Sequence, residues 1–288
     1  MLNIKHILFP IDFSERCCSA VPFVESMATR FGARITLITV TQPFSYVAMG
    51  DPGSAVVVDT DALMRDLKAR IDTALTHDFS HLTVDRIAEL GDPAQIITDF
   101  AHSHDVDLIM MPTHGYGLFR SLLLGSVTAK VLHDAQCPVW TAAHVAERPC
   151  RDHIACRNIL CAVDGEPLSG GLMKWAAEFA KDEGATLRFV HVIPGMEGFP
   201  SRQMDLEFEE ERRKNAAHAI SELQASSGVD APLCIAVGKI PESVRIEARR
   251  HRSDLVVIGR GTIHEALGRL RTHAYGIIRQ SPCPVLSV

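Results

Sequence analysis

Two properties are missing from this sequence, and each absence excludes a class of protein. No apolar run approaches the roughly 20 residues that a membrane-spanning helix needs, so we expect a soluble chain. There is also no excess of positive charge, since the net charge is −6 at pH 7 and the isoelectric point is near 6.1. Without a positive field to attract them, nucleic acid and anionic membranes are not expected partners.

Paired metal-ligand spacing is also absent from the cysteines, which do not form a zinc ribbon. Several stand inside apolar, strand-like runs, and we expect buried free thiols. Cys150, His153 and Cys156 lie close together in a polar stretch, but a metal or redox site there would need a fourth ligand that the spacing does not supply. The remaining cysteines are Cys17, Cys18, Cys137, Cys161, Cys234 and Cys283.

The N-terminus does not have the pattern of a signal peptide. Its sequence, MLNIKHILFPIDF, has one or two charges and then a short β-type run that ends in Asp12. A signal peptide needs a longer apolar stretch and a small-residue cleavage site. We therefore expect the first strand of a cytoplasmic protein.

What the sequence does contain is an internal repeat. A shift of 152 residues aligns Ile7–Asp12 with Ile159–Asp164, and shifts of 146 and 147 align later segments of the same two halves. A repeat this long is a tandem domain, because each copy is large enough to own a core. The polar, proline-containing stretch at 144–153 separates them, which predicts domains at 1–146 (copy one) and 154–288 (copy two).

Strand-like runs alternate with helical patterns inside each copy. Ser14 is a good N-cap for the helix after the first strand, and Asp92-Pro93 fits the N-cap and first position of a later helix. This alternation predicts an α/β fold of two tandem, doubly wound, five-stranded parallel sheets with helices on both faces. In copy one the strands are expected at about 5–12, 34–41, 83–90, 107–112 and 137–143.

A glycine-rich bend, MPTHGYGLFRSLLLGS at 111–126, follows the fourth expected strand of copy one. Ligands of doubly wound sheets sit beyond the carboxyl ends of the strands where the winding reverses, so Asp12 and this bend would share a crevice if strands one and four are neighbours. Backbone N–H groups of such a loop suit phosphate, and Gly125-Ser126 would add a donor and a hydroxyl. With Asp12 placed for a ribose hydroxyl or an adenine amino group, the pattern predicts a nucleotide pocket without a catalytic base in view.

These residues resemble the universal stress protein signature, which is glycine, two residues, glycine, nine residues, glycine, and serine or threonine. The opening strand with Pro10 and Asp12 is similar to that family's start, and the resemblance covers the chain twice. It implies a Rossmann-like fold of the adenine nucleotide alpha hydrolase type, a stress-response role, and ATP or AMP as ligand, with Mg²⁺ as an accompanying ion.

The resemblance also implies site residues. ATP-binding members of the family hold adenine and ribose through the first-strand aspartate and the end of strand two, and they hold the phosphates on the glycine loop. In copy one the assigned residues are Pro10, Asp12, Val40, Pro112, Gly115, Gly125 and Ser126. In copy two they are Asp164, Val192, Gly259, Gly261 and Thr272.

Two departures from the signature weaken the expected phosphate contacts. Pro112 replaces the first glycine and has no N–H, and a lost hydrogen bond to a charged group costs roughly 1.5–3 kcal/mol, or ten- to a hundredfold in affinity. The loop of copy two is one residue shorter, and Arg271-Thr272 replaces Gly125-Ser126. We expect a degenerate site there, unless Arg260 and Arg271 contact phosphate through their guanidinium groups.

Four other segments can be interpreted from the sequence. We expect Ser169-Gly170-Gly171 to start a helix and His114 to be a solvent-facing loop histidine. The acidic and then basic run at 205–214 forms a solvated helix face with ion pairs three and four residues apart. Residues 42–60 form a long loop after the second strand, and our hypothesis is that it closes over the nucleotide.

Each copy ends in a strand-like segment, Val139–Thr141 in copy one and Val285–Val288 in copy two. Members of the family dimerise through this last strand. The resemblance therefore implies that the two copies pair with each other inside the chain, which would cover both sheet edges. A homodimer of two chains is a further arrangement.

The favoured interpretation is a cytoplasmic stress-response module that binds ATP or AMP in copy one. Two alternatives stay open. A protein-interaction scaffold without ligand is favoured by Pro112 and by the degenerate second loop, whereas an ATP hydrolase of the same superfamily would need a base or metal set that the sequence does not supply.

Overall fold

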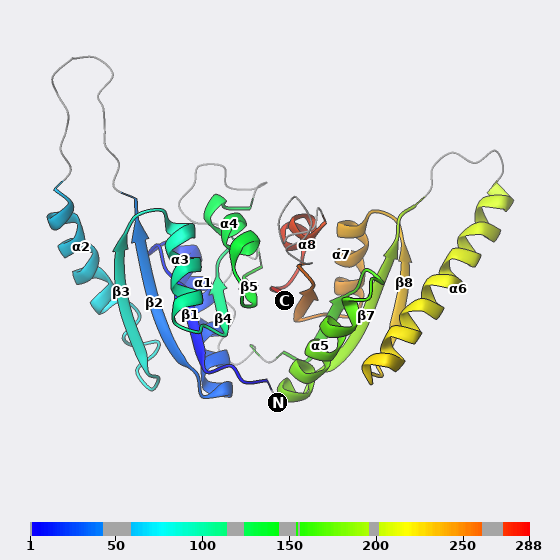
Figure 1. The fold of residues 1–288 in the computed structure, drawn as a ribbon, viewed down its shortest axis with the longest axis horizontal. Helices are drawn as coiled ribbons and strands as arrows, with labels where there is room; N and C mark the ends of the chain where they lie inside the picture. Colours follow the sequence, from blue (N-terminus) through cyan, green and yellow to red (C-terminus); the bar gives the residue numbers. More distant parts are fainter. Residues whose placement is uncertain are drawn as a thin grey trace, which may run out of the picture.

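The computed structural model consists of two α/β units whose sheets join edge to edge (Figure 1). The structure describes residues 2–42, 59–113, 124–143, 154, 156–195, 202–260 and 273–288. Within these residues, no helix is both long enough and apolar enough to cross a membrane.

Each unit contributes five strands. Copy one supplies β1 (His6–Pro10), β2 (Arg34–Thr41), β3 (Val84–Leu90), β4 (Leu108–Met111) and β5 (Val139–Thr141). Copy two supplies β6 (Asn158–Ala162), β7 (Thr186–Ile193), β8 (Leu233–Val237), β9 (Leu255–Ile258) and β10 (Val285–Ser287). All five strands expected in copy one are present, although β1, β4 and β5 are shorter than expected. β1 ends at Pro10 because the chain then turns toward the next helix.

The strand order is β3-β2-β1-β4-β5-β10-β9-β6-β7-β8. Every pairing inside a unit is parallel, and Ile7 of β1 lies opposite Ile35 of β2 and Leu108 of β4. The doubly wound prediction is therefore confirmed, with β1 and β4 as neighbours at the switch point. The units meet through β5 and β10, which run antiparallel with Trp140 opposite Leu286.

Helices cover both faces of the sheet, as the binary pattern predicts. One face carries α1 (Glu15–Phe31), α2 (Thr60–Thr73), α5 (Ser169–Glu183) and α6 (Arg202–Ser227). The other carries α3 (Pro93–Ser103), α4 (Ser126–Asp134), α7 (Ile240–Arg250) and α8 (Ala274–Gln280). Because strand side chains alternate, Ile7 and Phe9 pack on the first face and Leu8 on the second, so β1 is buried throughout.

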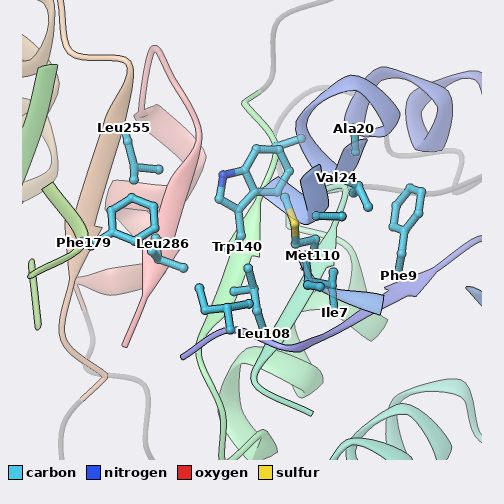
Figure 2. Close-up of a cluster of buried hydrophobic side chains, with 14 of the residues drawn as sticks. Ile7, Phe9, Ala20, Val24, Leu108, Met110, Trp140, Phe179, Leu255 and Leu286 are labelled. Atoms are coloured by element: carbon cyan, nitrogen blue, oxygen red, sulfur yellow. The ribbon is translucent and has the colours of Figure 1, made fainter. Parts of the chain in front are cut away.

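One hydrophobic cluster continues across the junction between the units (Figure 2). Trp140 of β5 lies in it with Met110 of β4, and the Trp140 ring is 5.0 Å from the Phe23 ring. Phe179 of α5 belongs to the same cluster, and its ring stacks 6.3 Å from the Phe31 ring of copy one. The two units therefore share buried apolar surface as well as strand hydrogen bonds.

The seven described cysteines are free thiols, which confirms that prediction for them. Cys17, Cys161 and Cys283 are buried, and the other four are partly buried. Burial raises the pKa of the Cys137 thiol to about 11 and that of Cys283 to about 12. These thiols stay protonated at neutral pH, so they are weak nucleophiles.

His6 is a buried titratable group at the amino end of β1, with 3% of its surface exposed. Its Nε2 lies 2.8 Å from the Thr36 hydroxyl oxygen, and its Nδ1 lies 3.1 Å from the His104 carbonyl oxygen. Desolvation by burial is the main cause that lowers the pKa of His6, and the positive charge of Arg34 acts in the same direction. The fold therefore favours the neutral ring.

A pH dependence of stability follows from His6. Because its folded pKa lies below the unfolded value of 6.5, the unfolded chain binds the proton first, and stability present above that pH is lost as the pH falls toward the folded pKa. We expect the free energy of unfolding, measured by urea titration between pH 7.5 and 5, to fall more steeply for wild type than for His6→Gln. Parallel curves for the two proteins would contradict the assignment.

Ser14 caps α1 and also binds the carboxylate of Asp12, two residues before it in the sequence. The Ser14 hydroxyl accepts a hydrogen bond from the Cys17 N–H at 3.2 Å and donates one to Asp12 Oδ1 at 2.6 Å. The Ser14 N–H donates to the same carboxylate oxygen at 3.0 Å. The predicted N-cap is confirmed, and it fixes the orientation of Asp12 at the end of β1.

Replacing this cap tests its double role. We expect Ser14→Ala to lower the free energy of unfolding by about 1–2 kcal/mol, since both a helix cap and a hydrogen bond to a carboxylate are lost. Ser80→Ala, at an exposed position, serves as the control and should change it by less than about 0.5 kcal/mol. Equal effects of the two substitutions, measured by urea denaturation at pH 7.5, would argue against a capping role.

Candidate functional site

The carboxyl ends of β1, β2 and β4 meet at the switch point of copy one. Pro10 is the last residue of β1 and lies opposite Ile38 of β2, while Val40 lies one residue before the end of β2. Asp12 follows two residues beyond β1 and is partly buried. Asp12 and Val40 therefore stand at the same edge of the sheet, as the sequence predicts.

The two ends of the glycine-rich loop of copy one are held together. The Thr128 hydroxyl donates to the Pro112 carbonyl oxygen at 3.1 Å, and the Gly125 N–H donates to the Thr113 carbonyl oxygen at 2.9 Å. The second bond uses the Gly125 N–H, which is one of the two backbone donors of the Gly125-Ser126 pair that the sequence offered for phosphate. Ser126 begins α4, whose first-turn amides have no partner within the helix and favour an anion. Gly115 lies outside the described residues.

Copy two contains a cavity of about 490 Å³ at the carboxyl ends of β6, β7 and β9. Asp164, Val192 and Gly259, which the sequence assigned to the site, all line it. Its apolar wall comes from both the sheet and the helices α7 and α8, including Val190, Ile258, Ile240, Val244 and Ile277. Gly261 and Thr272, the other two assigned residues of copy two, lie outside the described residues.

Polar side chains line one part of this cavity. Asp164 Oδ1 accepts hydrogen bonds from the Ser169 hydroxyl at 2.6 Å and from the Glu166 N–H at 3.0 Å, so its orientation is fixed like that of Asp12. His191 Nδ1 lies 3.0 Å from the Val163 carbonyl oxygen. Because a carbonyl oxygen only accepts, Nδ1 carries a proton, and in the neutral ring Nε2 is an acceptor.

Four polar residues of the lining were missed by the sequence analysis: His191, Arg212, Asn215 and His273. Arg212 and Asn215 belong to α6, whose run at 205–214 was interpreted as a solvated face. The expected ion pairs are present there, with Arg213 3.0 Å from Glu209, but Arg212 turns to the cavity and donates to the Pro194 carbonyl oxygen at 3.1 Å. The sequence could have indicated His191, because it directly precedes Val192, a predicted site residue.

Arg260 lies at the junction between the two units. Its side chain is 5% exposed and donates from Nη1 to the Ala135 carbonyl oxygen at 2.8 Å and from Nη2 to the Cys137 carbonyl oxygen at 2.7 Å. Both acceptors belong to copy one. Two donors of this guanidinium therefore serve the junction between the units, and Arg260 is not among the residues that line the copy-two cavity.

Several other motifs can now be placed. Ser169 is the first residue of α5, which confirms the predicted helix start. No group of three or more metal-ligating side chains occurs among the described residues. His114, Cys150, His153 and Arg271 lie outside those residues, as do 43–58 of the loop proposed to close over the nucleotide.

Comparison with known proteins places both halves in one family. The family model described as "Universal stress protein family" matches residues 3–142 and again residues 155–288. A relative from Thermus aquaticus, the universal stress protein in the QAH/OAS sulfhydrylase 3′ region, is 32% identical over 138 residues, which are 47% of this chain and 96% of that protein. A relative of that length therefore corresponds to one half of this chain.

Solved structures share the fold over the full length. A universal stress protein from Archaeoglobus fulgidus superposes with a TM-score of 0.69 at 20% identity, covering 99% of this chain and 98% of that one. The functionally unknown protein PA1789 from Pseudomonas aeruginosa gives a TM-score of 0.66 at 17% identity, with coverages of 99% and 92%. With its two Rossmann-like units each matched by the family model, the chain belongs to the universal stress protein family.

Proposed function

We propose that the chain is a cytoplasmic stress-response module that binds adenine nucleotides beyond the carboxyl ends of the strands in each unit. The observation that carries this proposal is the cavity of about 490 Å³ in copy two, lined by Asp164, Val192 and Gly259. Its volume is in the range of small-molecule sites, and it opens at a switch point, where doubly wound folds bind their ligands.

The chemistry of the cavity suits a nucleoside. Apolar side chains such as Val190 and Ile258 offer surface for a purine ring. The Asp164 carboxylate, held by Ser169, is placed to accept hydrogen bonds from ribose hydroxyls or an amino group, and His191 Nε2 is a second acceptor. A ligand with hydroxyl and amino donors and an apolar ring meets these groups better than a simple anion does.

The two copies differ in what they offer to phosphate. In copy one the first turn of α4 at Ser126 supplies amides and a hydroxyl, so we assign ATP or AMP, with Mg²⁺ where a polyphosphate is bound, to that copy. In copy two Arg260 is committed to the junction, so we assign adenosine or AMP there.

We also propose that the β5–β10 pairing persists in solution as an internal dimer, which the shared core at Trp140 supports.

Binding by the purified chain tests the proposal. We expect ATP and AMP to co-purify or to bind in calorimetry, with Asp12→Ala weakening binding at copy one and Asp164→Ala at copy two by about ten- to a hundredfold each, since each removes a charged hydrogen-bond partner. Mass analysis of the denatured protein identifies any retained nucleotide.

Matched variants keep this test specific. Asp72→Ala removes an exposed carboxylate on α2 far from either switch point and should leave affinity unchanged. Gly125→Arg places a long side chain at the start of α4 and should weaken ATP more than adenosine. A wild-type chain that binds none of these ligands at millimolar concentration would support the scaffold alternative instead.

A further inference from the structure

Arg260 is a buried cation that follows β9 of copy two and reaches a helix of copy one. Its backbone N–H donates to the Val288 carbonyl oxygen at 3.0 Å, which anchors it beside β10. From there its guanidinium donates to the carbonyl oxygens of Ala135, the C-cap of α4, and of Cys137 just beyond it. Arg260 lies 125 residues after Ala135 and 123 residues after Cys137 in the sequence.

The contact is chemically well matched. Carbonyl groups at the carboxyl end of a helix carry partial negative charge and lack helical partners, so a cation there is favourable. Both bonds are charge-assisted, and their lengths of 2.8 and 2.7 Å are those of strong examples. A buried guanidinium without such acceptors would be costly, so the position of α4 and that of Arg260 depend on each other.

A second contact joins copy two to the same helix. The Tyr275 hydroxyl of α8 donates to the Ala129 carbonyl oxygen of α4 at 3.3 Å. At its amino end, α4 is tied to copy one through Thr128 and the Pro112 carbonyl oxygen. The helix is thus held by its own unit through Thr128 and through Lys130, whose Nζ lies 3.3 Å from Asp92 Oδ2. The other unit holds it through the Ala129 and Ala135 carbonyl oxygens. Figure 1 shows α4 and α8 facing each other across the centre of the molecule.

We propose that Arg260 is a positioning residue for the phosphate end of the copy-one site. It acts through α4, whose amino end at Ser126 is where the proposed function places the phosphates, and this inference rests on that proposed function. Arg260 touches no ligand itself. A shift or tilt of α4 moves the first-turn amides away from the phosphates, whereas Asp12 and Val40, which belong to β1 and β2 and their ends, keep their place for adenosine.

The proposal predicts a loss that depends on the number of phosphates. In an Asp164→Ala background, which weakens copy two, Arg260→Met should reduce the affinity for ATP roughly tenfold and leave the affinity for adenosine within about twofold. Calorimetry with the two ligands gives this ratio. Hydrogen exchange of residues 126–135 without ligand should be faster in Arg260→Met, because the end of α4 is released.

Arg30→Met is the matched control. Arg30 also crosses the junction, with Nε 3.1 Å from Glu183 Oε1 and Nη1 3.3 Å from the Glu183 carbonyl oxygen, but it lies near the end of α1 and does not touch α4. It should leave the ATP-to-adenosine affinity ratio unchanged. Arg260→Lys, which keeps the charge, should recover part of the ATP affinity. If Arg260→Met does not fold, Arg260→Lys and Tyr275→Phe are tested in its place.

The outcomes separate this inference from the proposed function. If wild type binds ATP and Arg260→Met binds it equally well, Arg260 does not position the site. Equal losses of ATP and adenosine, or the same ratio change in Arg30→Met, would mean general loosening of the junction and would also overturn the proposal. If wild type binds neither ligand, the proposed function has failed, and unchanged exchange of α4 in Arg260→Met would then refute the positioning role as well.

Discussion

The antiparallel pairing of β5 with β10 joins two five-stranded units into one ten-stranded sheet. Each strand is short, and a three-residue edge strand alone would leave backbone N–H and C=O groups unpaired on an apolar edge. Their pairing satisfies these groups and brings Trp140 and Leu286 into a core that both units share. The relation of α4 to α8 follows from this junction.

The duplicated units share a serine–aspartate hydrogen bond after the first strand and differ in the loop after the fourth strand. In both, a serine hydroxyl near the start of the first helix fixes the carboxylate after the first strand, Ser14 for Asp12 and Ser169 for Asp164. The loops after the fourth strands differ, because the position after Gly259 carries an arginine whose side chain is used at the junction. The units thus match at the carboxylate that follows the first strand and differ in the residues that follow the fourth strand.

Buried polar groups mark where the fold is most constrained. His6 and Arg260 are both nearly excluded from water, and each forms hydrogen bonds with groups from distant segments. Such groups are costly unless they are satisfied, so they fix the relative positions of the elements that satisfy them. His6 does so within copy one, and Arg260 does so between the copies.

Local and periodic signals in the sequence determined the repeat, the α/β class, the caps at Ser14 and Asp92, and the placing of Asp12 and Asp164 at strand ends, because these depend on neighbouring residues and on the alternation of strands and helices. The tertiary structure alone decided which side chains meet across long separations. Arg260 was considered as a phosphate contact because of its loop, yet packing of the two units brings the end of α4 within its reach. Arg212 was assigned to solvent from its charge pattern, yet the placing of α6 beside β7 turns it to the cavity.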